Sequence, residues 1–166
     1  FPAGILARLR RIPLIVHEQN TKMGLVNRVL SRRATRVLWG LSLENGGHRT
    51  VSGNPVLRQP KENGKPAEKS DAFRILIVGG SQGAQFINKN MPLIMRCLAG
   101  KHQIEVWHQA GRKKKKETED LYLPTMTVRV DEFIDDMSKA YEWADCVIGR
   151  SGAMTVSELA LWGKPS

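Results

Sequence analysis

The chain has 166 residues, with 26 Lys plus Arg against 16 Asp plus Glu, and therefore a formal net charge of +10. Hydrophobic residues make up 41% and charged residues 25%, which is typical of a globular protein and excludes a disordered tail or a collagen-like repeat. The two cysteines, Cys97 and Cys146, lack CxxC spacing, so a zinc site or redox pair is disfavoured and a reducing cytoplasm is expected.

Basic and acidic residues are concentrated in different parts of the chain. Residues 1–36 hold eight basic side chains and one acidic one, whereas residues 131–166 hold seven acidic and three basic ones. This asymmetry predicts two structural units, the basic one facing anionic lipid or phosphate, although a solvated helix face explains it equally well. The sequence has no apolar run of about 18 residues that predicts a transmembrane helix.

Both ends of the sequence suggest an internal fragment of a longer protein. The chain starts at Phe1 without an initiator methionine, and it ends at Ser166 in a Gly-Lys-Pro-Ser turn signal with no strand after it. We expect exposed apolar surface in residues 1–53, because a partial sheet lacks the strands that would cover its core.

The first part of the chain predicts strand, helix and strand. Residues 12–17 form a β-branched apolar run, residues 24–34 carry apolar side chains at helical spacing, and residues 36–39 form the next short strand. The pattern weakens over residues 41–71, which are rich in glycine, proline and charged side chains. We interpret this stretch as a linker or exposed loop and as the best domain boundary.

The second part alternates between strands and helices. A helix at residues 85–98 is expected to bury an apolar stripe of Phe86, Met91, Ile94, Met95 and Leu98. The other expected elements are strands at 73–78, 104–108, 127–133 and 146–149, an exposed charged turn at 112–116, and helices at 137–143 and 155–162. This order predicts a doubly wound parallel α/β fold.

A glycine-rich loop at residues 79–84 lies between a predicted strand and a predicted helix. Glycines allow a tight turn there, and the free N–H groups of a helix N-terminus favour a phosphate group, so pyrophosphate binding is indicated. The spacing is not GxxxxGK[ST], and Ser81 stands where GxGxxG requires its middle glycine. A plain turn between strand and helix is the alternative.

A second turn of this kind follows the strand at residues 146–149, where Arg150, Ser151 and Gly152 precede a helix. Glu158 lies three residues after Thr155, so it is either the second half of a capping box or a carboxylate that accepts ribose hydroxyls. Spacing alone favours the capping box.

Other polar and aromatic residues follow the predicted strands. Phe133 stacks on a nucleobase or packs in the core, and the core is the more common place for a Phe. Adjacent Asp135 and Asp136 favour a helix N-cap over a metal pair. His17 and Glu18 suggest an acid and base pair, although chain neighbours project to opposite sides and a structural histidine is more usual.

Taken together, these segments resemble the MurG family of peptidoglycan N-acetylglucosaminyltransferases. The resemblance rests on Ile-Pro and His-Glu-Gln-Asn within residues 12–20, Gly-Asn-Pro-Val at 53–56, Val-Gly-Gly-Ser-Gln-Gly-Ala at 78–84, Phe-Ile-Asp-Asp-Met at 133–137, and Arg-Ser-Gly-Ala with Thr to Glu at 150–158. It extends over essentially the whole chain, and several motifs in the family's order are far more specific than one.

The resemblance implies a GT-B fold of two Rossmann-like parallel-sheet domains, both incomplete in this chain. Residues 1–53 would be the last part of the acceptor domain, and residues 54–166 the first part of the UDP-GlcNAc domain. The implied reaction transfers GlcNAc from UDP-GlcNAc to the C4 hydroxyl of the MurNAc of lipid I, with inversion and without a cofactor. Dependence on a divalent metal is left open.

The family's site residues carry over onto matching positions of this sequence. On the acceptor side, His17 and Glu18 are the catalytic candidates, and Asn20 and Asn27 face the cleft. On the donor side, Phe133 would cap the uracil, the main chain of Ile134 would recognise it, and Glu158 would accept the ribose hydroxyls. The remaining substrate-binding candidates are Arg58, Gly80, Ser81, Gln82, Gly83, Arg150, Ala153, Met154 and Thr155.

Two further expectations come from the family. Its N-terminal glycine loop with an activating histidine would precede Phe1 and its Gln-rich sugar-binding segment would follow Ser166, so we expect the parent protein, but not this chain alone, to be an active transferase. Family members are peripheral on the cytoplasmic face of the bacterial inner membrane, and Arg8, Arg10 and Arg11 would lie near their anionic lipid surface.

Competing functions fit the residues less well. A dinucleotide oxidoreductase needs GxGxxG and an acidic residue after the second strand, where Gln109 stands instead. A nucleic-acid partner is not expected, because the chain lacks interleaved aromatic residues and a recognised motif. The alternatives that stay open are a GT-B enzyme that transfers a UDP-sugar to another acceptor and, as the weaker one, a Rossmann nucleotide-binding module.

Overall fold

A computed structural model describes residues 2–41, 50–56, 70–80 and 83–166. The candidates Arg58, Ser81 and Gln82 therefore lie outside the described residues. The chain divides into two compact units, Phe1–Leu57 and Arg58–Ser166, whereas the sequence placed the boundary after Gly53. Asn54 belongs with the first unit, since its side-chain amide donates to the carbonyl oxygen of Gln19 at 3.3 Å.

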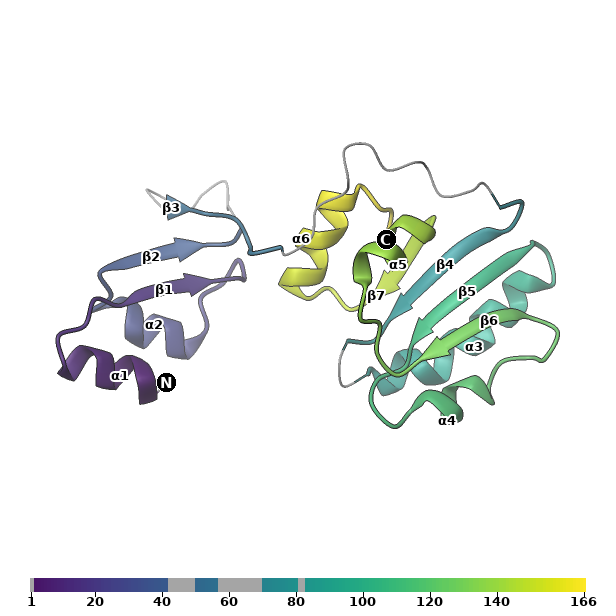
Figure 1. The fold of residues 1–166 in the computed structure, drawn as a ribbon, viewed down its shortest axis with the longest axis horizontal. Coiled ribbons are helices and arrows are strands. Elements are labelled where there is room, and N and C mark those ends of the chain that lie inside the picture. The colour runs from purple at the N-terminus through teal and green to yellow at the C-terminus, as the bar shows by residue number, and fades with distance from the viewer. Residues whose placement is uncertain (1, 42–49, 57–69, 81–82) are drawn as a thin grey trace. The chain divides into compact units, whose positions relative to one another are not determined.

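The first unit is a parallel sheet with strand order β1-β2-β3 (Figure 1). Its elements are α1 (Pro2–Leu9), β1 (Ile15–Glu18), α2 (Leu25–Ser31), β2 (Arg36–Trp39) and β3 (Thr50–Val51). The first strand begins three residues later than expected, because Pro13 has no N–H to donate and the N–H of Leu14 donates to the Thr35 hydroxyl instead. Strand β3 is missing from the prediction, since two residues are too few to show an alternating pattern.

The expected apolar exposure of the first unit is confirmed. Val16 and Trp39 are its buried apolar side chains among the described residues, at 5% and 7% exposure. The large apolar side chains that stay exposed are Ile5, Leu6, Leu9, Ile12, Ile15, Leu25, Val26, Val29 and Val51.

The second unit is a doubly wound half, as predicted, with parallel strands in the order β6-β5-β4-β7 (Figure 1). Its elements are β4 (Phe73–Val78), α3 (Gln85–Ala99), β5 (Ile104–Gln109), α4 (Lys115–Glu119), β6 (Thr127–Asp131), α5 (Met137–Trp143), β7 (Cys146–Gly149) and α6 (Ala153–Trp162). The expected exposed charged turn is right for Arg112 and Lys113, but helix α4 begins at Lys115, where the buried Thr118, at 1% exposure, holds one side of the helix.

Alternate residues of β4 point to opposite faces of this sheet and build two cores. Ile75 and Ile77 pack with Met91 and Met95 of α3, and Leu76 packs against α5 and α6. The predicted stripe of α3 is right for the two methionines and wrong for Phe86, Ile94 and Leu98, which are exposed. The buried face of α3 instead contains Asn88 and Pro92, which lie at helical spacing from the methionines.

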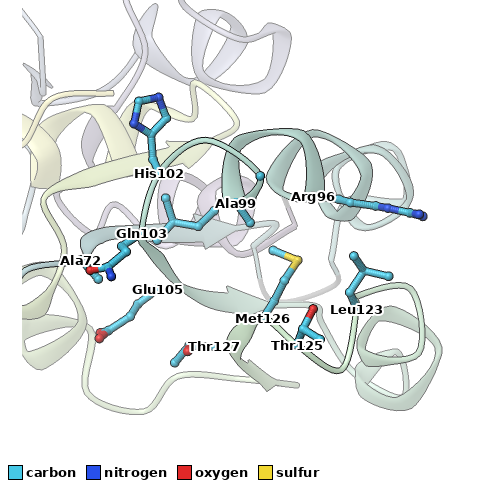
Figure 2. A pocket seen from close by; sticks show the side chains of 12 residues that line it. Ala72, Arg96, Ala99, His102, Gln103, Glu105, Leu123, Thr125, Met126 and Thr127 are labelled. Carbon is cyan, nitrogen blue, oxygen red and sulfur yellow. The ribbon is translucent and has the colours of Figure 1, made fainter.

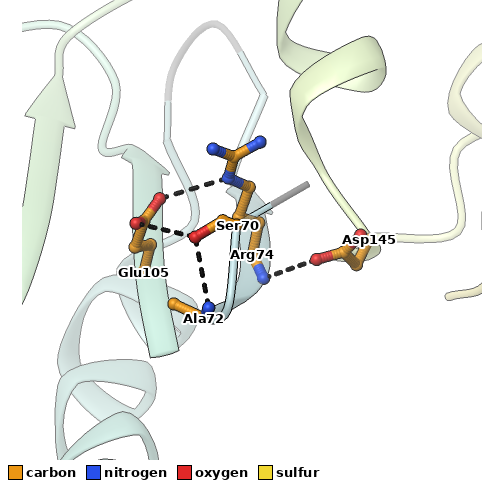
Figure 3. A network of polar contacts seen from close by, with 5 residues as sticks. All are labelled: Ser70, Ala72, Arg74, Glu105 and Asp145. Carbon is orange, nitrogen blue, oxygen red and sulfur yellow. Dashed lines mark hydrogen bonds and ion pairs between the residues drawn. The ribbon is translucent and has the colours of Figure 1, made fainter. Parts of the chain in front are cut away.

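A polar network joins the strands at their amino ends (Figure 3). The Arg74 guanidinium donates to Glu105 on the neighbouring strand, and the Arg74 N–H donates to Asp145 just before β7 at 2.8 Å. Ser70 contacts Glu105 as well and accepts from the N–H of Ala72. These contacts fix the start of β4 between both neighbours and leave the carboxyl ends of the strands to the loops described next.

Candidate functional site

The strand order of the second unit creates a crevice between the ends of two neighbouring strands. Strand β4 lies between β5 and β7, so the chain leaves β4 and β7 in different directions at the sheet's carboxyl edge. Ligands of open parallel sheets bind at such a reversal of strand order. The glycine loop follows β4 and the Arg150–Gly152 turn follows β7, so the two motifs singled out in the sequence meet here.

The backbone of the glycine loop is tightly constrained at Gly80 and Gly83, which the structure describes. Gly80 and Gly83 have φ angles of +82° and +70°, a region that favours glycine. A Cβ atom on Gly83 would stand 2.0 Å from the carbonyl oxygen of Ala110, so no larger residue fits. Helix α3 follows from Ala84, which has no polar side chain to cap its first N–H groups. Such an end favours an anion.

A cavity of about 320 Å³ opens at this crevice. Its lining residues are Val78, Gly80, Arg150, Ser151, Gly152 and Thr155. The guanidinium of Arg150 lies against the loop, with Nη2 3.1 Å from the point where a Cβ on Gly80 would stand. A permanent cation, two hydroxyls and a glycine backbone form a lining that suits phosphate groups.

Phe133 and Ile134 follow β6 at the same edge of the sheet. The Phe133 side chain is 57% exposed, which makes the core interpretation wrong and leaves an aromatic face open to a ligand. Ile134 is 4% exposed and packs in the core beside α5 and α6, so its main chain is held rigidly. Strand β6 ends at Asp131, two residues earlier than expected, and the carbonyl oxygens of Asp131 and Glu132 accept from the N–H groups of Ala110 and Gly111 in the loop after β5.

Glu158 does not cap a helix. Helix α6 begins at Ala153 with Gly152 as its N-cap, and Glu158 accepts a hydrogen bond from the hydroxyl of Tyr141 at 2.7 Å. The capping-box interpretation is therefore wrong. Ala153, Met154 and Thr155 form the first turn of α6 and are all half-buried. Asp136 is the N-cap residue of α5 as predicted, although its side chain makes no capping bond.

Behind the glycine loop lies a buried polar chain that the sequence analysis missed. Tyr122 donates to Nδ1 of His108, His108 Nε2 donates to Oδ1 of Asn88, and the Asn88 amide donates to the carbonyl oxygen of Ala110. Because the Ala110 carbonyl can only accept, the Asn88 amide nitrogen faces it, Asn88 Oδ1 faces His108, and Nε2 of His108 is the donor. Burial favours the neutral ring, in which Nδ1 accepts from Tyr122. Burial accordingly lowers the pKa of His108 from 6.5 to about 4, and burial raises the pKa of Tyr122.

In the first unit, Glu18 holds the loop that follows β1. Its carboxylate is 3% exposed and accepts from the N–H groups of Asn20 and Gly24, at 3.0 Å each, and from the side-chain amides of Asn20 and Asn27. Burial alone would raise the pKa of Glu18, but these four hydrogen bonds outweigh it and lower the pKa from 4.5 to about 2. The structure thus brings Glu18, Asn20 and Asn27 together, in a geometry suited to holding a loop.

His17 points to the other side of β1, as expected for neighbours on a strand. Its Nε2 lies 3.0 Å from the carbonyl oxygen of Gly53, so that nitrogen carries the proton and Nδ1 is the basic nitrogen of the neutral ring. The catalytic roles of His17 and Glu18 stay predictions.

A larger cavity, of about 730 Å³, lies at the opposite edge of the second unit's sheet (Figure 2). It is lined by residues at the start of β5 and β6, such as Ile104 and Thr127, and by the end of α3. The amino ends of parallel strands are not where ligands of such sheets bind, and in Figure 2 the Arg96 and His102 side chains point away from each other. We therefore place the candidate site at the smaller cavity.

Within the described residues, no three His, Cys, Asp or Glu side chains form a group that could hold a metal ion. In the same part of the chain, none of the helices has the length and apolar character needed to cross a membrane.

Comparison with known families decides the classification. Residues 74–166 match the glycosyltransferase family 28 C-terminal domain, and residues 1–39 match the N-terminal domain of the same family. The chain belongs to glycosyltransferase family 28. The GT-B type of α/β fold expected from the sequence is thereby confirmed.

The similarity to MurG is confirmed by family 28 relatives. The chain is 43% identical to the UDP-N-acetylglucosamine--N-acetylmuramyl-(pentapeptide) pyrophosphoryl-undecaprenol N-acetylglucosamine transferase of Shewanella loihica, and 42% identical to that of Shewanella frigidimarina. Each match covers 99% of this chain and 47% of the relative, so the chain spans about half the length of the curated relatives it matches.

Solved structures agree with this assignment. The crystal structure of Acinetobacter baumannii MurG matches with a TM-score of 0.75 and 35% identity, over 98% of this chain and 47% of that one. The glycosyltransferase of kitacinnamycin matches with a TM-score of 0.64 at 17% identity, over 99% of this chain and 53% of that one, and this likeness concerns the fold alone.

Proposed function

We propose that this chain is part of an inverting N-acetylglucosaminyltransferase that moves GlcNAc from UDP-GlcNAc to the C4 hydroxyl of the MurNAc of lipid I, which gives lipid II. The relatives named for this transfer support the proposal, since they match the chain from end to end. Such an enzyme serves peptidoglycan synthesis and, through the cell wall, cell shape and division. The second unit would belong to the donor domain and the first unit, with Asn54, to the acceptor domain.

The observation that carries the proposal is the position of Arg150 against the glycine loop at the switch point of the second unit. When the sugar leaves UDP, negative charge grows on the pyrophosphate. A fixed guanidinium, the backbone of Gly80 and the N-terminus of α3 would stabilise that charge. Ser81, Gln82 and Arg58, which lie outside the described residues, would add contacts to the phosphates by resemblance.

Recognition of uridine would come from residues around the same edge of the sheet. The exposed ring of Phe133 would cover the base, and the rigid main chain of Ile134 would read the edge of the uracil. Glu158 would accept the ribose hydroxyls, and the first turn of α6 at Ala153, Met154 and Thr155 would line the sugar pocket. Gly83 would let α3 start close to the phosphates.

The acceptor would meet the loop that Glu18 holds in the first unit. The four hydrogen bonds to its carboxylate would keep Asn20 and Asn27 in place beside the acceptor sugar, and Nδ1 of His17 would be available to a proton. No metal or cofactor is assigned to this reaction.

Calorimetric titration with UDP, with ADP as the control nucleotide, tests the donor half of the proposal. We expect the chain to bind UDP in preference to ADP and to lose this binding in Phe133→Ala and Arg150→Ala. A circular dichroism melt of each variant separates lost contacts from lost folding. Equal affinity for both nucleotides would favour a general nucleotide-binding module over a UDP-sugar transferase.

We further propose that the first unit contacts the anionic cytoplasmic face of the bacterial inner membrane as a peripheral protein. Arg10 and Arg11 are exposed after α1, next to the exposed apolar side chains of Leu9 and Ile12. Basic residues at an anionic surface contribute about 1 kcal/mol each. Sedimentation with phosphatidylglycerol vesicles, but not with phosphatidylcholine vesicles, should fall when Arg8, Arg10 and Arg11 are replaced by Gln. Equal sedimentation of the triple variant would contradict this proposal.

A further inference from the structure

Tyr141 is a buried polar residue to which the proposed function assigns no role. It lies in α5 and is 2% exposed, and its ring packs against Trp162 of α6 with 5.9 Å between the ring centres. Its hydroxyl reaches across to α6 and donates to Oε2 of Glu158 at 2.7 Å. Since this separation is short and the acceptor is a carboxylate, the bond is of the charge-assisted kind.

The phenol is a permanent donor. Burial raises the pKa of Tyr141, and the bond to Glu158 and the nearby carboxylate charge raise it further, so the hydroxyl keeps its proton at every physiological pH. Its ring is fixed within the core formed by Ala140, Ala144 and Leu159. The hydroxyl donor is therefore fixed in position, and the hydrogen bond that Glu158 accepts from it orients the carboxylate.

The bond commits only one of the two carboxylate oxygens of Glu158. Among the described residues, Oε1 has no hydrogen-bond partner, and the side chain is half-buried at the carboxyl edge of the sheet. A glutamate without a fixed partner would rotate freely and lose conformational entropy on binding a ligand. With Oε2 held by Tyr141, the orientation of Oε1 is set before any ligand arrives.

We propose that Tyr141 is a positioning residue that sets the preference for ribose, by holding Glu158 with Oε1 directed at the sugar hydroxyls of a uridine nucleotide. This inference rests on the proposed function, in which Glu158 accepts those hydroxyls. Tyr141 does not itself touch the nucleotide. Its removal should therefore weaken only the part of the affinity that depends on the hydroxyls.

Paired ligands test this role. The affinities of UDP and 2′,3′-dideoxy-UDP are measured by calorimetry for the wild-type chain, Tyr141→Phe, Glu158→Gln and the double variant. We expect Tyr141→Phe to bind UDP about tenfold more weakly while its affinity for dideoxy-UDP stays unchanged. Because Tyr141 acts through Glu158, adding Tyr141→Phe to Glu158→Gln should not reduce the preference for UDP over dideoxy-UDP any further.

Tyr122→Phe is the matched control, since it also removes a buried phenol hydroxyl from the second unit but has no contact with Glu158. It should keep the wild-type ratio of UDP to dideoxy-UDP affinity. If Tyr141→Phe also keeps this ratio while Glu158→Gln abolishes it, the role of Tyr141 is overturned and the proposed function stands. If a folded wild-type chain does not distinguish the two ligands, the role of Glu158 in the proposed function fails, and the role of Tyr141 with it.

Discussion

The side-chain amide of Asn88 donates to the carbonyl oxygen of Ala110 across 2.7 Å, and this same oxygen lies 2.0 Å from the place of any Cβ on Gly83. Asn88 therefore holds the peptide on which the glycine loop rests. His108 and Tyr122 in turn hold Asn88, so a chain of buried hydrogen bonds supports the loop from the interior of the sheet. The precision of the proposed phosphate site depends on this support as much as on the loop itself.

Gly83→Ala should weaken UDP binding at least tenfold, because the new methyl group must displace the Ala110 carbonyl or the loop. Gly163→Ala is its matched control, since Gly163 also has a positive φ angle of +57° but no atom within 4 Å of its Cβ position. Each variant bears a backbone strain of about 1 kcal/mol. Calorimetry should show the loss of affinity in Gly83→Ala alone, and an equal loss in both variants would contradict the argument.

Asn88→Ala should lower the free energy of unfolding by about 2 to 3 kcal/mol, because it leaves a buried donor on His108 and a buried acceptor on Ala110 without partners. UDP affinity should fall as well. Asn90→Ala is a control in the same helix, where the lost bond to the carbonyl of Phe86 is solvent-exposed, and its effect should stay within about 0.5 kcal/mol. Urea unfolding followed by circular dichroism measures both, and similar losses would refute the special role of Asn88.

The sequence was sufficient for the second unit's fold because its strands are long and apolar. Residues such as Ile75, Leu76 and Ile77 form an uninterrupted buried run, and the alternation of strands with helices leaves few topologies. It failed where few residues define an element, as in β3, which has two residues and depends on pairing with Trp39. Tertiary packing, and not local pattern, decides such a strand.

The candidate site was predictable where backbone conformation dictates the residue type, as at Gly80 and Gly83. It was not predictable for Asn88, because a polar residue on an apolar helix face is identified only when its partners are known. His108 lies at the end of a strand in the sequence, and nothing local distinguishes it from a solvent-exposed histidine. The roles of Phe133 and Glu158 came from family resemblance, since exposure and the Tyr141 bond are properties of the folded chain.

The buried His108 should make the second unit sensitive to mild acid. Its pKa is about 4 in the folded state and near 6.5 when unfolded, so the unfolded state binds the proton first as the pH falls. The contribution of the neutral ring is complete above pH 6.5 and is lost between about 6.5 and 4. The urea midpoint, followed by tryptophan fluorescence, should fall more steeply over this range in wild type than in His108→Gln. Parallel curves would contradict this assignment.

Glu18 should also make the protein less stable as the pH falls, but over a lower pH range than His108. Its folded-state pKa of about 2 lies below the ordinary 4.5, so its contribution is complete above pH 4.5 and is lost as the pH falls towards 2. Glu18→Gln should cost about 2 kcal/mol at pH 7, since an amide accepts less strongly and its NH₂ faces other donors. At pH 7, hydrogen exchange of the Asn20 and Gly24 amides should quicken in Glu18→Gln but not in the exposed Glu119→Gln.

The stability difference between wild type and Glu18→Gln should shrink as the pH falls from 4.5 to 2. A difference that stays constant would mean that the carboxylate charge does not hold this loop.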